Sequence, residues 1–215
     1  MVNLIEDIFE ILRSLPPRLL INCENIHRSV EDILSEDLSV PALPHGLLSQ
    51  STKLLSTNSA IWMLEDKARD HGATNLEITQ VKKSIDRLNQ KRNDQIEDLN
   101  NLFFEELGTT MNPNAPLFSE TPGSIIDRLG ILMVRQNQMR KRILQETYKA
   151  NNELKEQCRM KEKQIIKQAQ DLKAALIFLI EQVIQGKMKF HLYFQYKMYN
   201  DKHLNPYLYK SGKTA

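Results

Sequence analysis

The fold is decided by residues 78–103, whose sequence is ITQVKKSIDRLNQKRNDQIEDLNNLF. Apolar side chains recur in this stretch at spacings of three and four, which is the period of an amphipathic α-helix; they are Ile78, Val81, Ile85, Leu88, Ile96, Leu99 and Phe103. Thr74 and Glu77 have the spacing of a capping box, and Gly108 follows the last periodic residues. The sequence therefore predicts one long helix over 75–107, with an apolar side that other helices must cover.

Six segments in all have helical periodicity, and few residues alternate with the period of two that a strand requires. The expected helices cover residues 3–12, 17–34, 47–70, 75–107, 122–148 and 153–185. The last two are separated because the apolar period is lost in the charged stretch 148–163, and a single helix over both would be about 95 Å long. The sequence predicts an all-α helical bundle of five or six main helices over residues 1–185.

The charge of the chain is unevenly distributed. The 215 residues have a formal net charge of +2, yet residues 186–215 hold six lysines and one aspartate, a local charge of +5. The same 30 residues hold seven of the 14 aromatic side chains. This composition predicts a basic and aromatic C-terminal arm whose rings pack on the bundle while its lysines stay in water. Nucleic-acid or anionic-lipid binding by the arm is the alternative, and the low net charge makes nucleic acid the least favoured partner.

Several classes of protein are excluded by what the sequence lacks. The longest apolar run, 174–180, is far shorter than the roughly 20 residues that span a bilayer, and the N-terminus has no secretory signal. Cys23 and Cys158 are far apart, which suits a reduced cytoplasmic setting. The histidines have no metal-ligand spacing, and no phosphate-binding loop or dinucleotide motif is present. No dedicated metal site is expected. Glu65, Asp66, Asp86 and Glu97 could still hold Mg²⁺ through water and phosphate, so the sequence indicates no particular cofactor.

Charged residues fall on the apolar sides of two expected helices. In 47–70, one side carries Asn58, Trp62, Glu65, Asp66 and Arg69. In 75–107, Arg92 lies in the middle of the apolar stripe, beside a polar band made of Lys82, Asp86, Asn89, Asn93 and Glu97. A buried guanidinium needs a carboxylate partner, and the candidates are Glu65, Asp66 and Asp127. The set is either a structural ion-pair network between helices or the wall of a binding site. So many charges near one interface favour the site.

The start of the helix 122–148 has the features of an anion site. Thr121 is an N-cap before Pro122. Gly123 has no side chain, and the hydroxyl of Ser124 lies one turn into the helix. Free backbone N–H groups at a helix start attract anions, and Arg128 could add a charge-assisted contact. A plain helix cap is the alternative, and caps are far commoner than anion sites.

These observations define a candidate site for a small anionic ligand such as a phosphorylated metabolite or a nucleotide-sugar. The candidate catalytic residues are Glu65 and Asp66. The candidate ligand-binding residues are Asn58, Trp62, Arg69, Lys82, Asp86, Asn89, Arg92, Asn93, Thr121, Ser124, Asp127, Arg128 and Lys197. The alternative function is a non-enzymatic scaffold or interaction protein, which could form a homo-oligomer through residues 148–185.

Four motifs in order resemble a bacterial all-helical family of unknown function. They are Asn58-x3-Trp62-x2-Glu65-Asp66-x-Ala68-Arg69, then Ile85-Asp86-x-Leu88-Asn89-Gln90-x-Arg92-Asn93-Asp94, then Glu120-Thr121-Pro122-Gly123-Ser124-x-Ile126-Asp127-Arg128-Leu129, and Gln195-Tyr196-Lys197-Met198-Tyr199-Asn200-Asp201. The resemblance covers roughly residues 47–209 and implies an all-helical fold without an established activity. Relatives near glycosyltransferase and cell-envelope genes imply a role in envelope or glycan metabolism.

The resemblance also implies a role for the C-terminal residues. Lys197 and Asn200 would reach the shared site, which would make the arm a closing strap. The chain departs from the family pattern at Met63, where relatives have His, and at Lys202, where they have Pro. The missing His weakens the enzymatic interpretation.

Overall fold

The computed structural model describes residues 46–194 and 201–209, and within these ranges the chain is all-helical. The elements are α3 (Gly46–Lys67), α4 (Asn75–Leu107), the 3₁₀ turn η3 (Gly108–Thr110), α5 (Pro122–Tyr148), α6 (Asn152–Ile184) and the short α7 (Pro206–Tyr209). Four long helices are therefore present in the described part. The helices expected over 3–12 and 17–34 lie outside the described residues. The all-α class is therefore confirmed, and four of the expected main helices are observed in the described part.

The helix boundaries follow from local capping. Thr74 and Glu77 form the expected capping box at the start of α4, where Thr74 Oγ1 accepts from Glu77 N and the Glu77 carboxylate accepts from Thr74 N. Thr121 caps α5 with Pro122 in the first turn, also as expected. The end of α3 was predicted at Asp70 and lies at Lys67 instead. The last turn is tightened by hydrogen bonds three residues apart, from Arg69 N to Asp66 O and from Asp70 N to Lys67 O.

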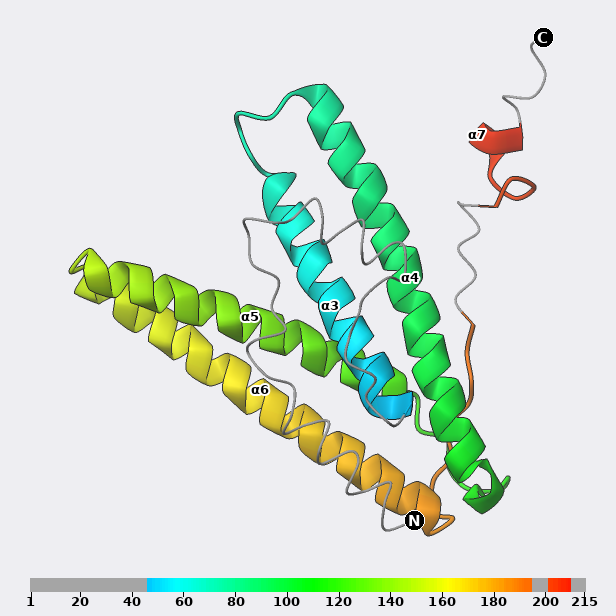
Figure 1. Ribbon diagram of the computed structural model, residues 1–215. Helices are drawn as coiled ribbons and strands as arrows, with labels where there is room; N and C mark the ends of the chain where they lie inside the picture. Colours follow the sequence, from blue (N-terminus) through cyan, green and yellow to red (C-terminus); the bar gives the residue numbers. More distant parts are fainter. Residues whose placement is uncertain (1–45, 195–200, 210–215) are drawn as a thin grey trace.

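The break expected near 148–153 separates α5 from α6. Ala150 has a φ of 55°, which reverses the chain, and Asn151 Oδ1 then accepts from Leu154 N to cap α6. Figure 1 shows the result: α5 and α6 lie side by side as one antiparallel pair, and α3 and α4 form a second pair that meets α5.

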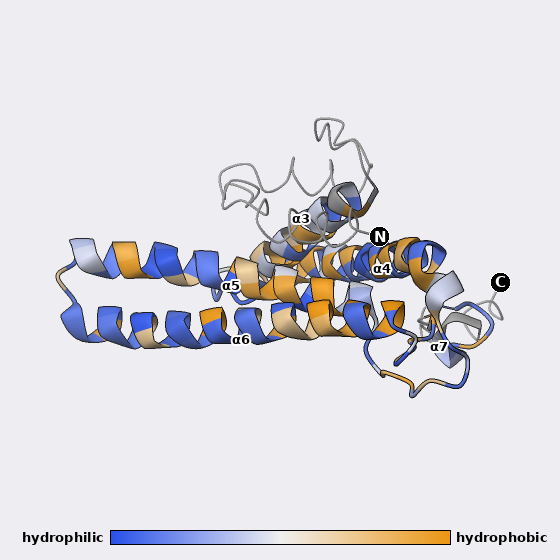
Figure 2. Cartoon of the chain, turned by 90° about the horizontal axis from the view of Figure 1, so that it is seen from below, coloured by the Kyte–Doolittle hydropathy of each residue, from blue (hydrophilic) through white to orange (hydrophobic). Residues whose placement is uncertain are grey.

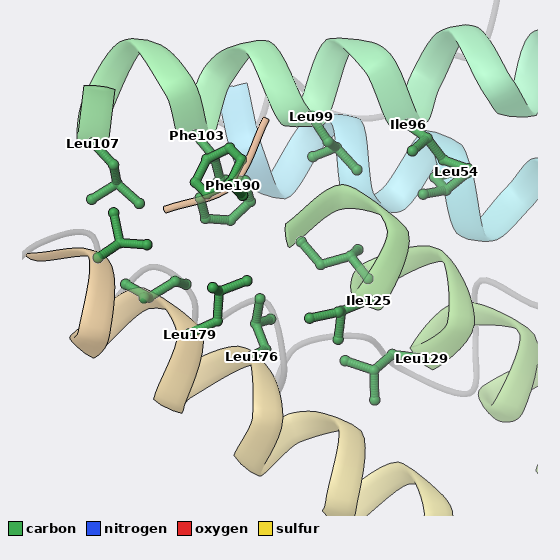
Figure 3. Close-up of a cluster of buried hydrophobic side chains, with 13 residues drawn as sticks. Leu54, Ile96, Leu99, Phe103, Leu107, Ile125, Leu129, Leu176, Leu179 and Phe190 are labelled. Carbon is green, nitrogen blue, oxygen red and sulfur yellow. The ribbon is translucent and has the colours of Figure 1, made fainter. Parts of the chain in front are cut away.

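The main core lies where both helix pairs meet. Figure 3 shows side chains from α3, α4, α5 and α6 pointing into the space between these helices, together with Phe190 from the chain after α6. The buried members are Leu54, Ile96, Leu99, Phe103, Leu107, Ile125, Ile126, Leu129, Leu176, Leu179, Ile180, Val183 and Phe190. A second cluster joins α3 to the first half of α4 and is made of Ala60, Ile61, Leu64, Val81, Ile85 and Leu88. The stripe that predicted α4 is thus shared between two clusters.

Two glycines on α5 set how closely it approaches its neighbours. A Cβ at Gly123 would lie 2.7 Å from the backbone oxygen of Ile96 and 2.6 Å from Asn100 Oδ1, both on α4. A Cβ at Gly130 would lie 3.2 Å from Asn58 Nδ2 on α3. The two positions are one heptad apart and therefore share one side of α5. Residue 127 lies between them and is held against both α3 and α4.

The chain after α6 returns to the end of α4. Phe118 N donates to Lys189 O over 2.7 Å, and Lys189 N donates to Pro116 O over 3.0 Å. Phe190 is buried and meets Phe104 edge to face, with ring centroids 6.4 Å apart. Lys187 stays exposed, as do the rings of Tyr193 and Phe194. Within 186–194, burial is therefore concentrated in one aromatic ring.

No helix in the described part is both long and apolar enough to cross a membrane.

Candidate functional site

Three helices meet at one carboxylate oxygen. Oδ1 of Asp127 on α5 accepts a hydrogen bond from Asn58 Nδ2 on α3 over 2.9 Å, and the same oxygen lies 3.8 Å from Arg92 Nε on α4. Asn58 and Asp127 are buried, and the Arg92 side chain is 28% exposed. Asp127 is thus the member of the three expected candidates that lies beside Arg92. The carboxylate fixes the positions of two side chains that point toward a pocket.

Burial dominates the electrostatics of Asp127. Desolvation raises the pKa of its carboxyl above 3.8, while the hydrogen bond from Asn58 and the charge of Arg92 lower it by less. An ion pair with nitrogen and oxygen 3.8 Å apart offsets only part of the cost of removing the carboxylate from water. Asn58 Oδ1 and Arg92 Nε are themselves buried without a hydrogen-bond partner. Buried polar atoms without a partner cost free energy, which indicates that this cluster is not arranged for stability alone.

The pocket lies between α3, α4 and α5 and has a volume of about 370 Å³. Its lining residues come from all three helices and the turn after α3: Asn58, Ile61, Trp62, Glu65, Asp66, Arg69, Arg92, Ile131, Val134 and Arg135. The volume falls in the range of small-molecule sites, which combine an apolar wall with a few polar groups. The structure therefore brings six of the predicted residues together around one cavity.

Two of the pocket's charges are paired with each other. Arg69 Nη1 lies 2.8 Å from Glu65 Oε2 and also donates to the Glu65 carbonyl oxygen. The Arg69 side chain is 68% exposed because α3 has already ended at Lys67. Asp66 is exposed beside this pair. An exposed pair contributes little to stability, so a ligand could take over either partner at small cost.

The profile of the family "Protein of unknown function (DUF4254)" matches residues 50–192. The chain belongs to this family. The matched range contains every residue that lines the pocket, and it excludes Lys197. Searches of curated proteins and of solved structures find no significant match. The match therefore places all the pocket-lining residues within one DUF4254 domain and assigns them no activity.

The N-terminus of α5 within the DUF4254 domain is occupied by the protein's own acceptors. Ser124 N donates to Thr121 Oγ1, and Thr121 N donates to Ser124 Oγ. Gly123 N donates to Asn100 Oδ1 over 2.8 Å, from a buried position. The backbone N–H groups that would hold an anion are thus already satisfied. Neither Thr121 nor Ser124 lines the pocket, so this arrangement favours the alternative of a plain helix cap.

Other predicted residues are placed away from the pocket. Arg128 pairs with Glu120 and lines a different cavity, between α5 and α6. Lys82 and Asp86 are exposed on α4, and Asn89 and Asn93, one half-buried and one buried, do not line the pocket. Lys197, and with it the predicted closing strap, lies outside the described residues. In the described ranges, no three His, Cys, Asp or Glu side chains are grouped as a metal site would need.

Arg135 is the charged pocket residue that sequence reasoning missed, together with the apolar residues Ile61, Ile131 and Val134. The signal was present, because Ile131 and Arg135 follow Asp127 at spacings of four and eight and so share its side of α5. Arg135 is exposed and makes no hydrogen bond or ion pair with any described residue.

Proposed function

We propose that the pocket between α3, α4 and α5 binds a small anionic ligand, such as a phosphorylated metabolite or a nucleotide-sugar of envelope or glycan metabolism. The observation that carries the proposal is that Arg69, Arg92 and Arg135, from three separate elements, line one cavity beside the only tryptophan of the chain. Guanidinium groups hold phosphate and carboxylate with paired hydrogen bonds. The two carboxylates of the pocket leave it with an excess of one positive charge.

Each cation has a distinct environment, and this suggests distinct roles. Arg92 is mostly buried and is steadied by Asp127, so it would give the least screened contact to an anion. Arg135 has no partner among the described residues and could turn toward the ligand without breaking a contact. Arg69 would exchange its exposed pair with Glu65 for a contact to the ligand. Trp62, which is half-buried, offers a flat apolar face to a ring.

Glu65 and Asp66 are the candidate catalytic residues of this proposal. A general base must lie within hydrogen-bond reach of the proton that it removes. Both carboxylates line the same cavity as the arginines, so a bound anion would lie beside them. Asp66 is the exposed member, while Glu65 is held by Arg69.

Ligand-induced stabilisation tests the proposal directly. Thermal unfolding followed by circular dichroism is measured with inorganic pyrophosphate, nucleoside monophosphates and diphosphates, and nucleotide-sugars. A ligand at 100 times its Kd stabilises the folded state by about 2.7 kcal/mol. We expect Arg92→Ala to lower this stabilisation by about 1.4 kcal/mol or more while leaving the protein folded. Glu65→Gln, which removes a negative charge and releases Arg69 from its ion pair, should preserve or increase the stabilisation. Arg87→Ala is the matched control, because Arg87 is an exposed arginine on α4 that does not line the pocket. Stabilisation of equal size in all three variants would refute the assignment.

A second candidate function is docking of another chain, and exposed side chains on the far part of the α5–α6 pair favour it. Figures 1 and 2 both show this part extending beyond α3 and α4. Leu144 and Met160 are 59% exposed and Tyr148 is 88% exposed. The homo-oligomer surface predicted over 148–185 cannot include the buried side chains of its last part, because Leu176, Leu179, Ile180 and Val183 belong to the core.

Light scattering separates the docking function from ligand binding. Tyr148→Glu and Met160→Glu should lower the molecular mass of an oligomer while helicity is retained. Leu76→Glu is the control, since Leu76 is 68% exposed at the start of α4 and away from the pair. A monomeric mass for the unmodified protein would rule out self-association through this surface.

A further inference from the structure

A second and larger cavity lies on the other side of α5. It has a volume of about 590 Å³ and lies between α5 and α6. Its floor is apolar, with Leu132 from α5 and Leu172 and Ala175 from α6. Gln168 and Asp171 from α6 and Arg128 from α5 add polar groups. Apolar floors with a few polar groups are typical of small-molecule sites, and the proposed function makes no use of this cavity.

The two cavities adjoin along a ridge of α5. Ile131 and Arg135 line both of them. At about 100° per residue, these two side chains lie between Val134, which lines only the smaller cavity, and Leu132, which lines only the larger one. The ridge of Ile131 and Arg135 is therefore the wall between the two cavities, and a ligand that crossed it would pass over the Arg135 guanidinium.

Arg135 is the cation best suited to hold the middle of such a ligand. The other arginines of the two cavities each lie against a carboxylate: Arg69 against Glu65, Arg92 against Asp127 and Arg128 against Glu120. Arg135 alone among these four has no partner in the described ranges. A guanidinium between two cavities can bind an anion at the centre of a ligand whose two substituents extend into the two cavities.

We propose that the two cavities form one composite site for a diphosphate diester, whose charged centre binds Arg135 and whose two substituents occupy the two cavities. The inference rests on the proposed function and names its substrate class. In the smaller cavity Trp62, Ile61 and Val134 would take a planar ring. In the larger cavity Gln168 and Asp171 would bind hydroxyl groups of the second substituent, with its apolar face on Leu172 and Ala175.

The arrangement of charge supports a doubly charged centre. Arg92 lines the smaller cavity from α4, and Arg128, one heptad before Arg135 on α5, lines the larger one, so each cavity has a further cation beside Arg135. A diphosphate diester carries two negative charges, which a single guanidinium cannot neutralise. A ligand with its anion at one end would leave the larger cavity empty and would make no use of Gln168 and Asp171.

Affinities of one-sided and two-sided probes test the composite site. The one-sided probes are ADP and UDP, and the two-sided probes are diadenosine diphosphate and diuridine diphosphate; binding to the full chain is measured by calorimetry. Ala175→Phe fills the larger cavity from its floor. Ala174→Phe is the matched control, because Ala174 is the preceding residue of α6, is exposed and does not line the cavity. Circular dichroism verifies that both variants are folded.

We expect the second substituent to raise affinity by about tenfold or more, and Ala175→Phe to remove that gain while leaving the one-sided probes unchanged. Ala174→Phe should preserve the gain, and Arg135→Ala should weaken the two-sided probes. Binding of ADP or UDP through Arg92, with no gain from the second substituent or a gain that survives Ala175→Phe, would overturn the composite site and leave the proposed function intact. Failure of both probe classes and of pyrophosphate to bind would overturn both.

Discussion

Asn58 donates a hydrogen bond to Asp127 over 2.9 Å, and this contact ties α3 to α5 at the base of the pocket. Arg92 approaches the same oxygen from α4 at 3.8 Å. Gly130 lies directly against this contact, since a Cβ there would lie a tight 3.2 Å from Asn58 Nδ2. The buried carboxylate therefore links the packing of three helices to the positions of two side chains in the pocket.

The first prediction concerns the pH dependence of stability at Asp127. Burial raises the pKa of this carboxyl in the folded protein above its unfolded value of 3.8. Between those two pKa values the folded state binds more protons than the unfolded state, so the free energy of unfolding falls as pH rises. Asp127→Asn removes the titration. We expect the stability of Asp127→Asn relative to the unmodified protein to increase as pH rises above 3.8, and then to become constant above the folded pKa.

Urea unfolding of both proteins from pH 3 to pH 8 measures this difference. Asp86→Asn, which changes an exposed carboxyl on α4, controls for the loss of one charge. A relative stability of Asp127→Asn that decreases with rising pH would mean that Arg92 and Asn58 outweigh desolvation.

The second prediction concerns the close approach of α5 to α4. In Gly123→Ala, the added methyl carbon would lie 2.7 Å from the Ile96 carbonyl oxygen, a backbone atom that cannot move alone. Overpacking of this kind costs about 1–3 kcal/mol. Gly108→Ala is the control, because its Cβ would meet Phe104 at an ordinary 3.5 Å and its φ of −58° suits alanine. Urea midpoints should fall for Gly123→Ala and remain the same or rise for Gly108→Ala.

The parts of this fold that depend on neighbouring residues could be predicted from sequence. Capping by Thr74 and Thr121 and the break after Tyr148 involve side chains within a few residues of the helix ends. The predicted end of α3 at Asp70 is three residues beyond the observed end at Lys67. The backbone there changes from hydrogen bonds four residues apart to hydrogen bonds three residues apart, and the pattern of apolar side chains is the same for both. Local chemistry thus fixed where most of the described helices start and stop.

The site was only partly predictable, because it depends on how α5 is turned against its neighbours. The sequence narrowed the partner of Arg92 to three carboxylates, and the close contacts at Gly123 and Gly130 select Asp127. The same rotation turns Arg128 toward α6 and brings Arg135 to both cavities. Such long-range packing leaves no trace in the periodicity of a single helix.

The third prediction concerns the residues that follow α6. Phe190 is 1% exposed and packs with the main core, so Phe190→Ala should lower the free energy of unfolding by about 3–5 kcal/mol. Phe194→Ala is the control, because that ring is 54% exposed only four residues later. Chemical denaturation of the two variants measures the difference. Equal stability would mean that burial of the Phe190 ring contributes nothing to the stability of the fold.

The fourth prediction uses Trp62 as a reporter of the pocket. It is the only tryptophan in the chain, so intrinsic tryptophan fluorescence arises from one wall of the site. We expect UDP or pyrophosphate to change its emission with a saturable dependence on concentration, because the added anion alters the field and the solvent around the indole. Arg92→Ala should shift the midpoint to a concentration at least about tenfold higher, which corresponds to the loss of about 1.4 kcal/mol from one charge-assisted contact.

Arg87→Ala should leave the midpoint unchanged, since Arg87 lies on α4 but not in the pocket. A linear response that is the same in all three proteins would indicate collisional quenching by free anions, and would remove Trp62 from the binding site.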